Sequence, residues 1–312
     1  MPRFDVTIAG ELNLDLILYG LPADLPAERE VLAERMMLTL GSSSAIVAHN
    51  LASLGNRVGF QSLVGGDELG QIALKRLGES GVDTSLVRHT HGSQTGLTVI
   101  LQRQQQRNIL TYSGTIAELT FADLDIDYLS DARHFHLSSF YLQSGLRPQV
   151  PELFRRLKAA GLTISLDTND DPEDRWGELR EVLRNVDIFL PNEREACKIA
   201  ATDDRRLAVE RLAEMVPLVV VKLGAKGAIA RRGKQIVESP ALNVDAVDPV
   251  GAGDSFDAGF LHQYVRGADL ASCLAWGNLA GALSTTRSGG TEAFRDREHL
   301  ENFLRERAKV LP

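Results

Sequence analysis

Short apolar runs alternate with helix-forming segments through the first two thirds of this sequence, and no other feature restricts the possible folds as much. Six apolar runs predict buried strands: Phe4–Ala9, Val58–Val64, Phe135–Ser138, Leu162–Asp167, Val186–Leu190 and Leu218–Leu223. The segments between them predict helices: Ser44–Leu54, Glu68–Ser80, Pro151–Ala160, Arg175–Arg184, Glu193–Ala200 and Asp203–Met215. Strands and helices that alternate in this way are joined by crossover connections. We therefore expect an α/β fold with a doubly wound, mostly parallel sheet flanked by helices.

The rest of the chain departs from this alternation. The C-terminal third predicts helices: Asp254–Arg266, Asp269–Thr286 and Arg295–Ala308. The segment Ile17–Leu40 contains two prolines and predicts irregular structure, whereas Thr95–Tyr112 alternates apolar and polar residues and predicts a β-hairpin. We expect one domain over residues 1–312, with a small discontinuous β lid at approximately residues 14–40 and 94–114.

The overall charge and the cysteine content narrow the class of protein. The net charge of −8 argues against a nucleic-acid partner, but not against a nucleotide held by glycine-rich loops or a metal. Cys197 and Cys273 lack metal-ligand spacing, so we expect buried free thiols in a reducing compartment. No apolar stretch has the length of a signal peptide or a membrane span, and we expect a cytoplasmic protein without a membrane partner.

Residues 248–259, Asp-Pro-Val-Gly-Ala-Gly-Asp-Ser-Phe-Asp-Ala-Gly, carry the strongest functional signal. Gly251, Ala252 and Gly253 immediately precede Asp254 at the predicted start of a helix. Glycine lets backbone N–H groups approach an anion closely, and a helix N-terminus adds unpaired N–H groups and a positive dipole end. A carboxylate beside a phosphate held there can take a proton from an attacking hydroxyl, which indicates phosphoryl transfer. The same residues also fit an ordinary loop with Asp254 as a helix cap.

This segment resembles the C-terminal signature of the ribokinase-like (PfkB) carbohydrate kinase family, Asp-Thr-x-Gly-Ala-Gly-Asp-x-Phe, with Pro249 in place of the threonine. Other family motifs follow in order along nearly the whole chain. The resemblance implies that Asp254 is the catalytic base and that the backbone of residues 251–254 forms the anion hole. It also implies that ATP donates its γ-phosphoryl group to a hydroxymethyl group of a sugar. Because a helix N-terminus favours the ionised form of a carboxylate, we expect Asp254 to be a weak but reliably charged base.

Two further motifs concern metal ions. Asn192 and Glu195 follow the predicted strand Val186–Leu190 with the spacing of a helix capping box. They also resemble the family's Asn-x-x-Glu motif, which implies that Asn192 binds the nucleotide and that Glu195 holds Mg²⁺ through water. Mg²⁺ suits a site where few carboxylates meet substrate phosphates. Asp248 and residues 286–290 resemble the elements that hold a monovalent cation in many members, which would make K⁺ a further cofactor.

Two N-terminal segments resemble the family's substrate loops. Asn13 and Asp15 follow the first predicted strand, and loops beyond the carboxyl ends of parallel strands host ligands. The resemblance implies that both bind sugar hydroxyls. Gly41 and Ser42 begin a segment similar to the family's Gly-Gly-x-x-x-Asn, which implies further substrate contacts. Here a serine replaces the second glycine and Ile46 replaces the asparagine. The apolar Ile46 keeps a nucleoside open as the acceptor.

A third segment, at Asp167 and Asn169, resembles the Asp-Pro-Asn element of sugar kinases and implies that both residues border the sugar. Family members that act on phosphorylated sugars often have lysine after the Gly-Gly pair, where this chain has Ser43. The sequence therefore favours an unphosphorylated sugar or sugar acid. Arg103 and Arg107 of the predicted hairpin leave a phosphorylated acceptor open.

The nucleotide site is expected after the last predicted strand. The segment that contains Lys222, Gly224 and Gly227 resembles the family's nucleotide loop, beside the phosphates and ribose of ATP. Asn278 occupies the position of a family residue near the adenine. The glycines alone also fit a strand–turn–strand connection.

The sequence also leaves alternative functions open and suggests an oligomeric state. A nucleoside kinase of the same family would use the same catalytic segment, and a sugar- or nucleotide-binding sensor would keep the fold without turnover. Retention of Asp254 argues against the sensor. A nicotinamide-dependent oxidoreductase is improbable because the sequence lacks Gly-x-Gly-x-x-Gly. Apolar positions of the predicted lid, such as Leu97, Val99 and Ile109, suggest a homodimer formed through the lid.

Overall fold

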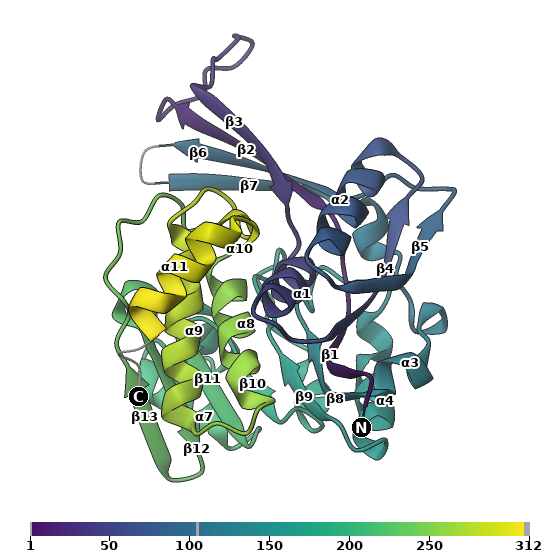
Figure 1. The fold of residues 1–312 in the computed structure, drawn as a ribbon, viewed down its shortest axis with the longest axis vertical. Helices are drawn as coiled ribbons and strands as arrows, with labels where there is room; N and C mark the ends of the chain where they lie inside the picture. The colour runs from purple at the N-terminus through teal and green to yellow at the C-terminus, as the bar shows by residue number, and fades with distance from the viewer. Residues whose placement is uncertain (1, 104–105, 309–312) are drawn as a thin grey trace.

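The computed structural model describes residues 2–103 and 106–308, and its largest element is a nine-stranded sheet (Figure 1). In spatial order the strands are β13 (Gln235–Ser239), β12 (Ala228–Arg232), β11 (Leu218–Lys222), β10 (Ile188–Phe189), β9 (Thr163–Leu166), β8 (Ala132–Leu137), β1 (Phe4–Ala9), β4 (Val58–Gly65) and β5 (Asp83–Thr90). The strands from β11 to β5 run parallel, while β12 and β13 are antiparallel at one edge. The predicted α/β fold is confirmed.

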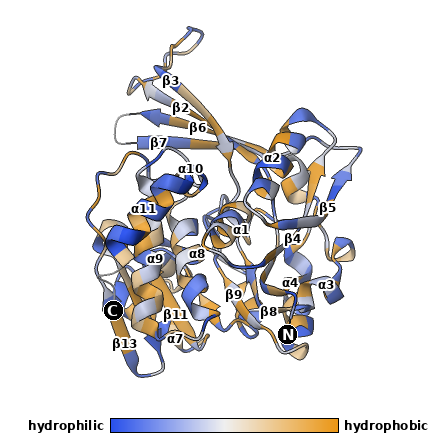
Figure 2. Cartoon of the chain, viewed as in Figure 1, coloured by the Kyte–Doolittle hydropathy of each residue, from blue (hydrophilic) through white to orange (hydrophobic). Residues whose placement is uncertain are grey.

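Helices cover both faces of this sheet, and each face has its own apolar core. The first face carries α1 (Ser43–Ser53), α2 (Glu68–Glu79), α8 (Ala252–Tyr264) and α9 (Leu270–Thr285). The second carries α3 (Ile126–Ser130), α4 (Val150–Ala159), α5 (Leu179–Leu183), α6 (Glu193–Ile199) and α7 (Arg205–Ala213). Two further helices, α10 (Glu292–Arg295) and α11 (Arg297–Arg307), pack on α9. The inner strands β9 and β11 are hydrophobic, whereas α11 at the surface is largely hydrophilic (Figure 2).

A separate four-stranded sheet stands beyond the carboxyl ends of the parallel strands (Figure 1). Its order is β3 (Arg35–Leu40), β2 (Leu14–Leu21), β6 (Leu97–Arg103) and β7 (Gln106–Tyr112). The hairpin predicted over Thr95–Tyr112 is confirmed, because β6 and β7 pair antiparallel. The irregular structure predicted for Ile17–Leu40 is wrong at both ends, where β2 and β3 pair antiparallel. The strand was missed because β2 is almost continuously apolar, so it lacks the expected alternation.

Three other expectations need correction. The helix predicted over Arg175–Arg184 is only α5, because the Asp171 carboxylate accepts backbone N–H bonds from Arg175 and Trp176 and holds that stretch in a loop. The strands β5 and β13 were not predicted, and β12 was expected only in the alternative strand–turn–strand interpretation of the glycine loop. Cys273 is buried as expected, but Cys197 is only partly buried on α6. In the part of the chain that the structure describes, no helix combines the length and the apolar character needed to cross a bilayer.

Candidate active site

Several functional segments meet at the carboxyl edge of the large sheet. The strand order reverses between β1 and β8, and the loops that leave a parallel sheet at such a point open a crevice. The loop after β1 leads directly into β2, which carries Asp15. Asp167 and Asn169 follow β9, and Lys222 ends β11 at the same edge. The fold thereby gathers residues that are up to about two hundred positions apart in the sequence.

The first turn of α8 provides the catalytic candidate. Gly251 is the N-cap, with φ 72°, and a Cβ on this residue would lie 2.4 Å from the Cα of Gly290. Glycine is therefore required both for the left-handed backbone and for the close approach of the two loops. Ala252 and Gly253 follow in the first turn, where N–H groups lack helical partners, although the Ala252 N–H donates to the Pro249 carbonyl at 3.2 Å. The carboxylate of Asp254 lies in the same turn, and the residue is buried.

The environment of Asp254 differs from the sequence expectation. Burial and, next, the neighbouring Asp167 carboxylate raise the pKa of Asp254, while Lys222 and hydrogen bonds from Ser43 and Asn169 lower it less. The amide Nδ2 of Asn169 lies 3.5 Å from Asp254 Oδ1. The expected preference for the ionised form at the helix N-terminus is thus outweighed by loss of water. A raised pKa makes Asp254 a stronger base than an exposed aspartate.

Lys222 lies beneath this turn in a buried ion-pair cluster. Its Nζ is 2.6 Å from Asp167 Oδ2 and 3.1 Å from Asp257 Oδ2, and both aspartates are buried. The ammonium also approaches Gly253, since a Cβ on that glycine would lie 3.6 Å from Lys222 Nζ. Sequence reasoning placed Asp167 against the sugar and Lys222 against the nucleotide. In the structure the two residues are hydrogen-bonded to each other beside Asp254.

Asp15 and Asp248 bring two further carboxylates toward this turn. Burial, followed by the charges of Asp254 and Asp248, raises the pKa of Asp15 to about 7. A Cβ on Gly41 would lie 2.1 Å from Asp15 Oδ1, so a larger residue there would displace the carboxylate. Asp248 accepts hydrogen bonds from Tyr19 Oη (2.5 Å) and from two backbone N–H groups. These three donors occupy the Asp248 carboxylate. The geometry of Asp248 therefore gives no specific support to the expected monovalent-cation site.

Asn13 and Ser42 hold the two substrate loops together. The buried Asn13 accepts a backbone hydrogen bond from Gly41 N at 3.0 Å and donates its side-chain amide to the Leu14 carbonyl. Ser42 caps α1, accepting from Ala45 N, and donates to the Glu11 carbonyl at 2.5 Å. Ser42 has φ 69° and ψ 121°, a conformation that strains any residue with a Cβ. This explains physically why the resembling motif has glycine at that position.

The strain at Ser42 gives a stability prediction. Ser42→Gly and Ser42→Ala both lose the same two side-chain hydrogen bonds, but only the glycine variant loses the backbone strain. We expect Ser42→Gly to have the larger free energy of unfolding, by about 1–3 kcal/mol. Urea denaturation of the two variants measures this difference. An alanine variant as stable as the glycine variant would show that the backbone relaxes without cost.

Ile46 packs against the catalytic turn. A Cβ built on Gly251 would lie 3.3 Å from its Cδ1, and one on Gly290 would lie 2.7 Å from it. Asn50, one turn further along α1, donates to Ser255 Oγ at 2.9 Å and to the Gly290 carbonyl at 3.1 Å. The apolar Ile46 thus fills the junction between α1 and α8, and Asn50 fixes that junction with hydrogen bonds.

Asn192 and Glu195 form a complete capping box at the start of α6. Asn192 Oδ1 accepts from Glu195 N at 2.9 Å, and Glu195 Oε2 accepts from Asn192 N at 2.9 Å. Burial and, next, the charge of Asp167 raise the pKa of Glu195 to about 7. Asn192 also pairs with Lys222 in an isolated β-bridge, which connects the motif to the ion-pair cluster. The capping geometry leaves a buried carboxylate that a cation would stabilise.

The nucleotide candidates lie on the β11–β12 connection and on α9. Gly224 starts a 3₁₀ turn with φ 58°, and Gly227 ends it with φ 95°. A Cβ on Gly227 would lie 2.0 Å from the Ser239 carbonyl, so the turn packs directly on the end of β13. Asn278 donates to the carbonyls of Ser239 and Pro240, both at 3.1 Å. Asn278 therefore fixes the loop after β13, and Gly227 contacts the same loop.

Two residues of this centre were missed from the sequence. Asp257 lies three positions after Asp254, on the same face of α8, and this spacing could have identified it. Tyr19 was missed because it lies in the segment that predicted irregular structure. Its hydroxyl joins β2 to Asp248 and so connects the small sheet to the catalytic loop.

The comparisons with known proteins fit this geometry. The family described as pfkB family carbohydrate kinase matches residues 3–297. The chain belongs to this family. It is therefore a phosphotransferase with an alcohol group as acceptor, and the predicted family resemblance is confirmed.

Among its relatives, an uncharacterized sugar kinase of Archaeoglobus fulgidus is 31% identical over 78% of this chain and 96% of the relative. The 2-dehydro-3-deoxygluconokinase of Bacillus subtilis is 29% identical over 85% and 86% of the two chains. The solved adenosine kinase of Sinorhizobium meliloti has a TM-score of 0.82 at 26% identity, over 92% and 95%. A candidate ribokinase II of E. coli, solved with ATP and Mg²⁺, has a TM-score of 0.81 at 26% identity, over 97% and 99%.

Proposed function

We propose that this protein transfers the γ-phosphoryl group of ATP to a hydroxymethyl group of an unphosphorylated sugar or sugar acid. The observation that carries the proposal is the buried Asp254 carboxylate in the first turn of α8, beside Asp15 and Asn169. A base, an anion-binding turn and sugar-binding polar groups thereby meet at one edge of the sheet. The sugar-acid kinase of Bacillus subtilis and the ribokinase of Haemophilus influenzae among the relatives favour this acceptor class.

Each residue then has a role in the transfer. Asp254 accepts the proton of the sugar hydroxyl, and the backbone N–H groups of residues 251–254 stabilise the charge on the phosphoryl oxygens. Asp15 and Asn13, with Gly41 and Ser42 beside them, orient the sugar hydroxyls. Asn169 contacts Asp254 and borders the same sugar. Phosphoryl transfer depends mainly on such positioning and charge stabilisation.

The residues present fit Mg²⁺. Mg²⁺ is commonly held by one or two carboxylates together with substrate phosphates and water. Glu195 supplies one buried carboxylate, and burial and, next, the charge of Asp167 raise its pKa to about 7. Asn192 fixes both carboxylate oxygens by hydrogen bonds. When bound, Mg²⁺ neutralises the phosphates of ATP, and we propose that Glu195 holds it through water while Gly224, Gly227, Lys222 and Asn278 form the nucleotide side.

A panel of acceptors tests the function. Coupled ADP-release assays with pentoses, hexoses, sugar acids and nucleosides should give turnover with a free sugar or sugar acid. Turnover with nucleosides alone would establish the second candidate, which is favoured by the apolar Ile46 and by relatives named as cytidine and adenosine kinases. Binding without turnover for every ligand would establish a sensor. Turnover only with phosphorylated sugars would refute the proposed acceptor class. The panel should include phosphorylated sugars because one relative is named as a ribose-1-phosphate kinase.

The four-stranded sheet is proposed as a lid on one domain, and as a dimer interface. Met36, Ile109, Leu110 and Tyr112 on this sheet are exposed, with 55% of Ile109 accessible. Leu97 and Val99 are instead partly buried, so the exposed strand β7 supplies most of the apolar surface. We expect sedimentation to give a homodimer, which Ile109→Arg would convert to a monomer. A wild-type monomer at high protein concentration would refute the interface.

The raised carboxylate pKa values predict an unusual pH dependence. Asp15 and Glu195 have pKa values of about 7, and the pKa of Asp254 is also raised. These groups act when ionised and become protonated as the pH falls through their pKa. We therefore expect kcat/KM to fall as the pH drops through about 7, far above the range where ordinary carboxylates titrate. Activity unchanged down to pH about 5, in protein that stays folded, would contradict this assignment.

A further inference from the structure

A cavity lies at the opposite edge of the large sheet from Asp254. It has a volume of about 540 Å³, a size typical of small-molecule sites. Its lining comes from the amino ends of β8, β9 and β11, the last residue of β12, and the segment that ends α8. Because α8 is about 20 Å long, this cavity is separate from the catalytic turn at the start of the helix. A ligand can therefore occupy it together with both substrates.

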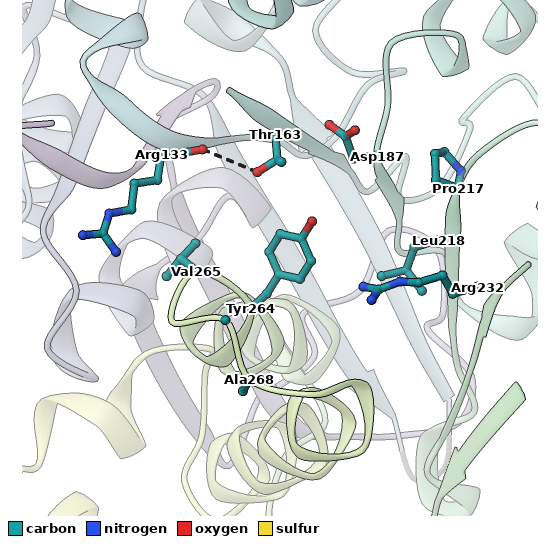
Figure 3. A pocket seen from close by; sticks show the side chains of 10 residues that line it. Arg133, Thr163, Asp187, Pro217, Leu218, Arg232, Tyr264, Val265 and Ala268 are labelled. Carbon is teal, nitrogen blue, oxygen red and sulfur yellow. Dashed lines mark hydrogen bonds between the residues drawn. The ribbon is translucent and has the colours of Figure 1, made fainter. Parts of the chain in front are cut away.

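Two arginines flank this cavity. Arg133 lies on β8 and Arg232 ends β12, and Figure 3 shows them on opposite sides of the Tyr264 ring. Within residues 2–103 and 106–308, neither guanidinium forms an ion pair, whereas the adjacent Arg231 pairs with Glu210 at 3.7 Å. One exposed arginine is ordinary on a protein surface. The charge of Arg133 acts on the Asp5 carboxylate, which forms its own ion pair with Arg57. Two guanidinium groups without an ion pair among the described residues, on the walls of one cavity, form a local positive field in an acidic protein.

The acidic group in the cavity is already neutralised. Asp187 accepts from Lys158 Nζ at 2.7 and 2.8 Å and from Ile164 N at 2.7 Å. Its charge is thus balanced within the protein and does not compensate Arg133 or Arg232. The remaining lining includes the hydroxyl groups of Thr163 and Tyr264 and the apolar side chains of Pro217, Leu218, Val265 and Ala268. The cavity therefore offers positive charge at its two sides and an apolar floor with hydroxyl groups.

The two arginines reach the cavity from strands that lie far apart in the sheet. β8 and β12 are four strand positions apart, which places their backbones roughly 19 Å from each other. The Tyr264 ring also separates the two guanidinium groups (Figure 3). We propose that this cavity is a second ligand site, for an elongated organic dianion with an anionic group at each end and an apolar middle. Each guanidinium can bind one phosphate or carboxylate through paired N–H donors.

Calorimetry on the full chain tests the site. A non-hydrolysable ATP analogue with Mg²⁺ is added first to fill the catalytic anion site. The probes are 1,6-hexanediol bisphosphate, adipate and inorganic phosphate, none of which has a sugar hydroxyl. We expect one equivalent of the bisphosphate or of adipate to bind more tightly than inorganic phosphate. Which of the two binds more tightly assigns a phosphate or a carboxylate ligand.

Variants connect that binding to the cavity. Arg133→Gln and Arg232→Gln should each raise the Kd by roughly tenfold, as expected for one lost charge-assisted hydrogen bond. Both should keep the turnover of the wild type without probe, which shows that the fold is intact. Arg180→Gln removes an exposed arginine of α5 and should leave the Kd unchanged. No binding of either dianion, or equal binding by the double variant, would overturn the proposal.

Discussion

An Asp254→Asn variant is expected to lose kcat by roughly a thousandfold, within the range that a general base contributes. Asparagine has nearly the same shape but cannot accept the proton of the attacking hydroxyl. The backbone of residues 251–254 is unchanged, so ATP binding should remain close to that of the wild type. Steady-state kinetics measures the loss of turnover, and titration with a non-hydrolysable ATP analogue measures the binding.

The stability of Asp254→Asn separates lost chemistry from lost fold. Because burial raises the pKa of Asp254, its ionised form is disfavoured in the folded protein at neutral pH. Asparagine removes that cost, and we expect the variant to unfold at the same or higher urea concentration. Asp170→Asn is the matched control for stability, since this exposed aspartate forms an ion pair with Arg194 at the surface. Near-normal turnover in Asp254→Asn would refute the assignment of the base.

The sequence was most informative where one physical preference decided the structure. The strand over Val219–Val221 combines β-branched residues with complete burial, and a buried strand was predicted there. The hairpin near Thr95–Tyr112 was predicted because its faces alternate. The strand β2 was not, because Leu16 and Ile17 are apolar on successive faces and one face packs on the catalytic loop at Val250. Contacts of that kind arise only when distant segments meet.

In the candidate site, too, local features could be predicted from the sequence and contacts between distant segments could not. The glycine requirement at Gly251 follows from local backbone geometry, and the motif alone pointed to it. The pKa of Asp254 was expected in the wrong direction, because the helix N-terminus is a local effect. Burial beside Asp167 raises the pKa of Asp254 and outweighs the effect of the helix N-terminus. Asp167 lies 87 positions earlier in the sequence (254 − 167). Pairings across such distances, like that of Lys222 with Asp257, cannot be obtained from the spacing of one motif.

That pairing predicts the largest effect on stability. Lys222 is the only cation in hydrogen-bond contact with the buried Asp167 and Asp257 among residues 2–103 and 106–308. Burial raises the pKa of Asp257 more than Lys222 lowers it, so the ionised form of this residue is disfavoured. Burial also acts on Asp167, but Lys222 and a hydrogen bond from Asp257 together outweigh it and lower the pKa of Asp167. A proton therefore binds more readily to Asp257 than to Asp167.

These opposite pKa shifts give different expectations for two variants. Lys222→Met leaves the Asp167 carboxylate buried without its partner and should lower the free energy of unfolding by about 3–5 kcal/mol. Asp257→Asn keeps the shape of the side chain and removes a charge that burial disfavours, and it should change the free energy of unfolding by less than about 1 kcal/mol. Guanidinium denaturation at pH 7 measures both. Lys226→Met is the control, because this exposed lysine forms a 3.9 Å surface pair with Glu193.

The same cluster should affect catalysis through Asp254. Lys222 lowers the pKa of Asp254, so its removal should move the acidic limb of kcat/KM to higher pH. Asp257→Asn retains the lysine and should leave that limb where it is in the wild type. A purely structural role for Lys222 would reduce the amount of folded protein without moving the limb. An Asp257→Asn variant as unstable as Lys222→Met would instead mean that the ion pair of Lys222 with Asp257 stabilises the fold as much as the pair with Asp167, and the expectation for Asp257 would be wrong.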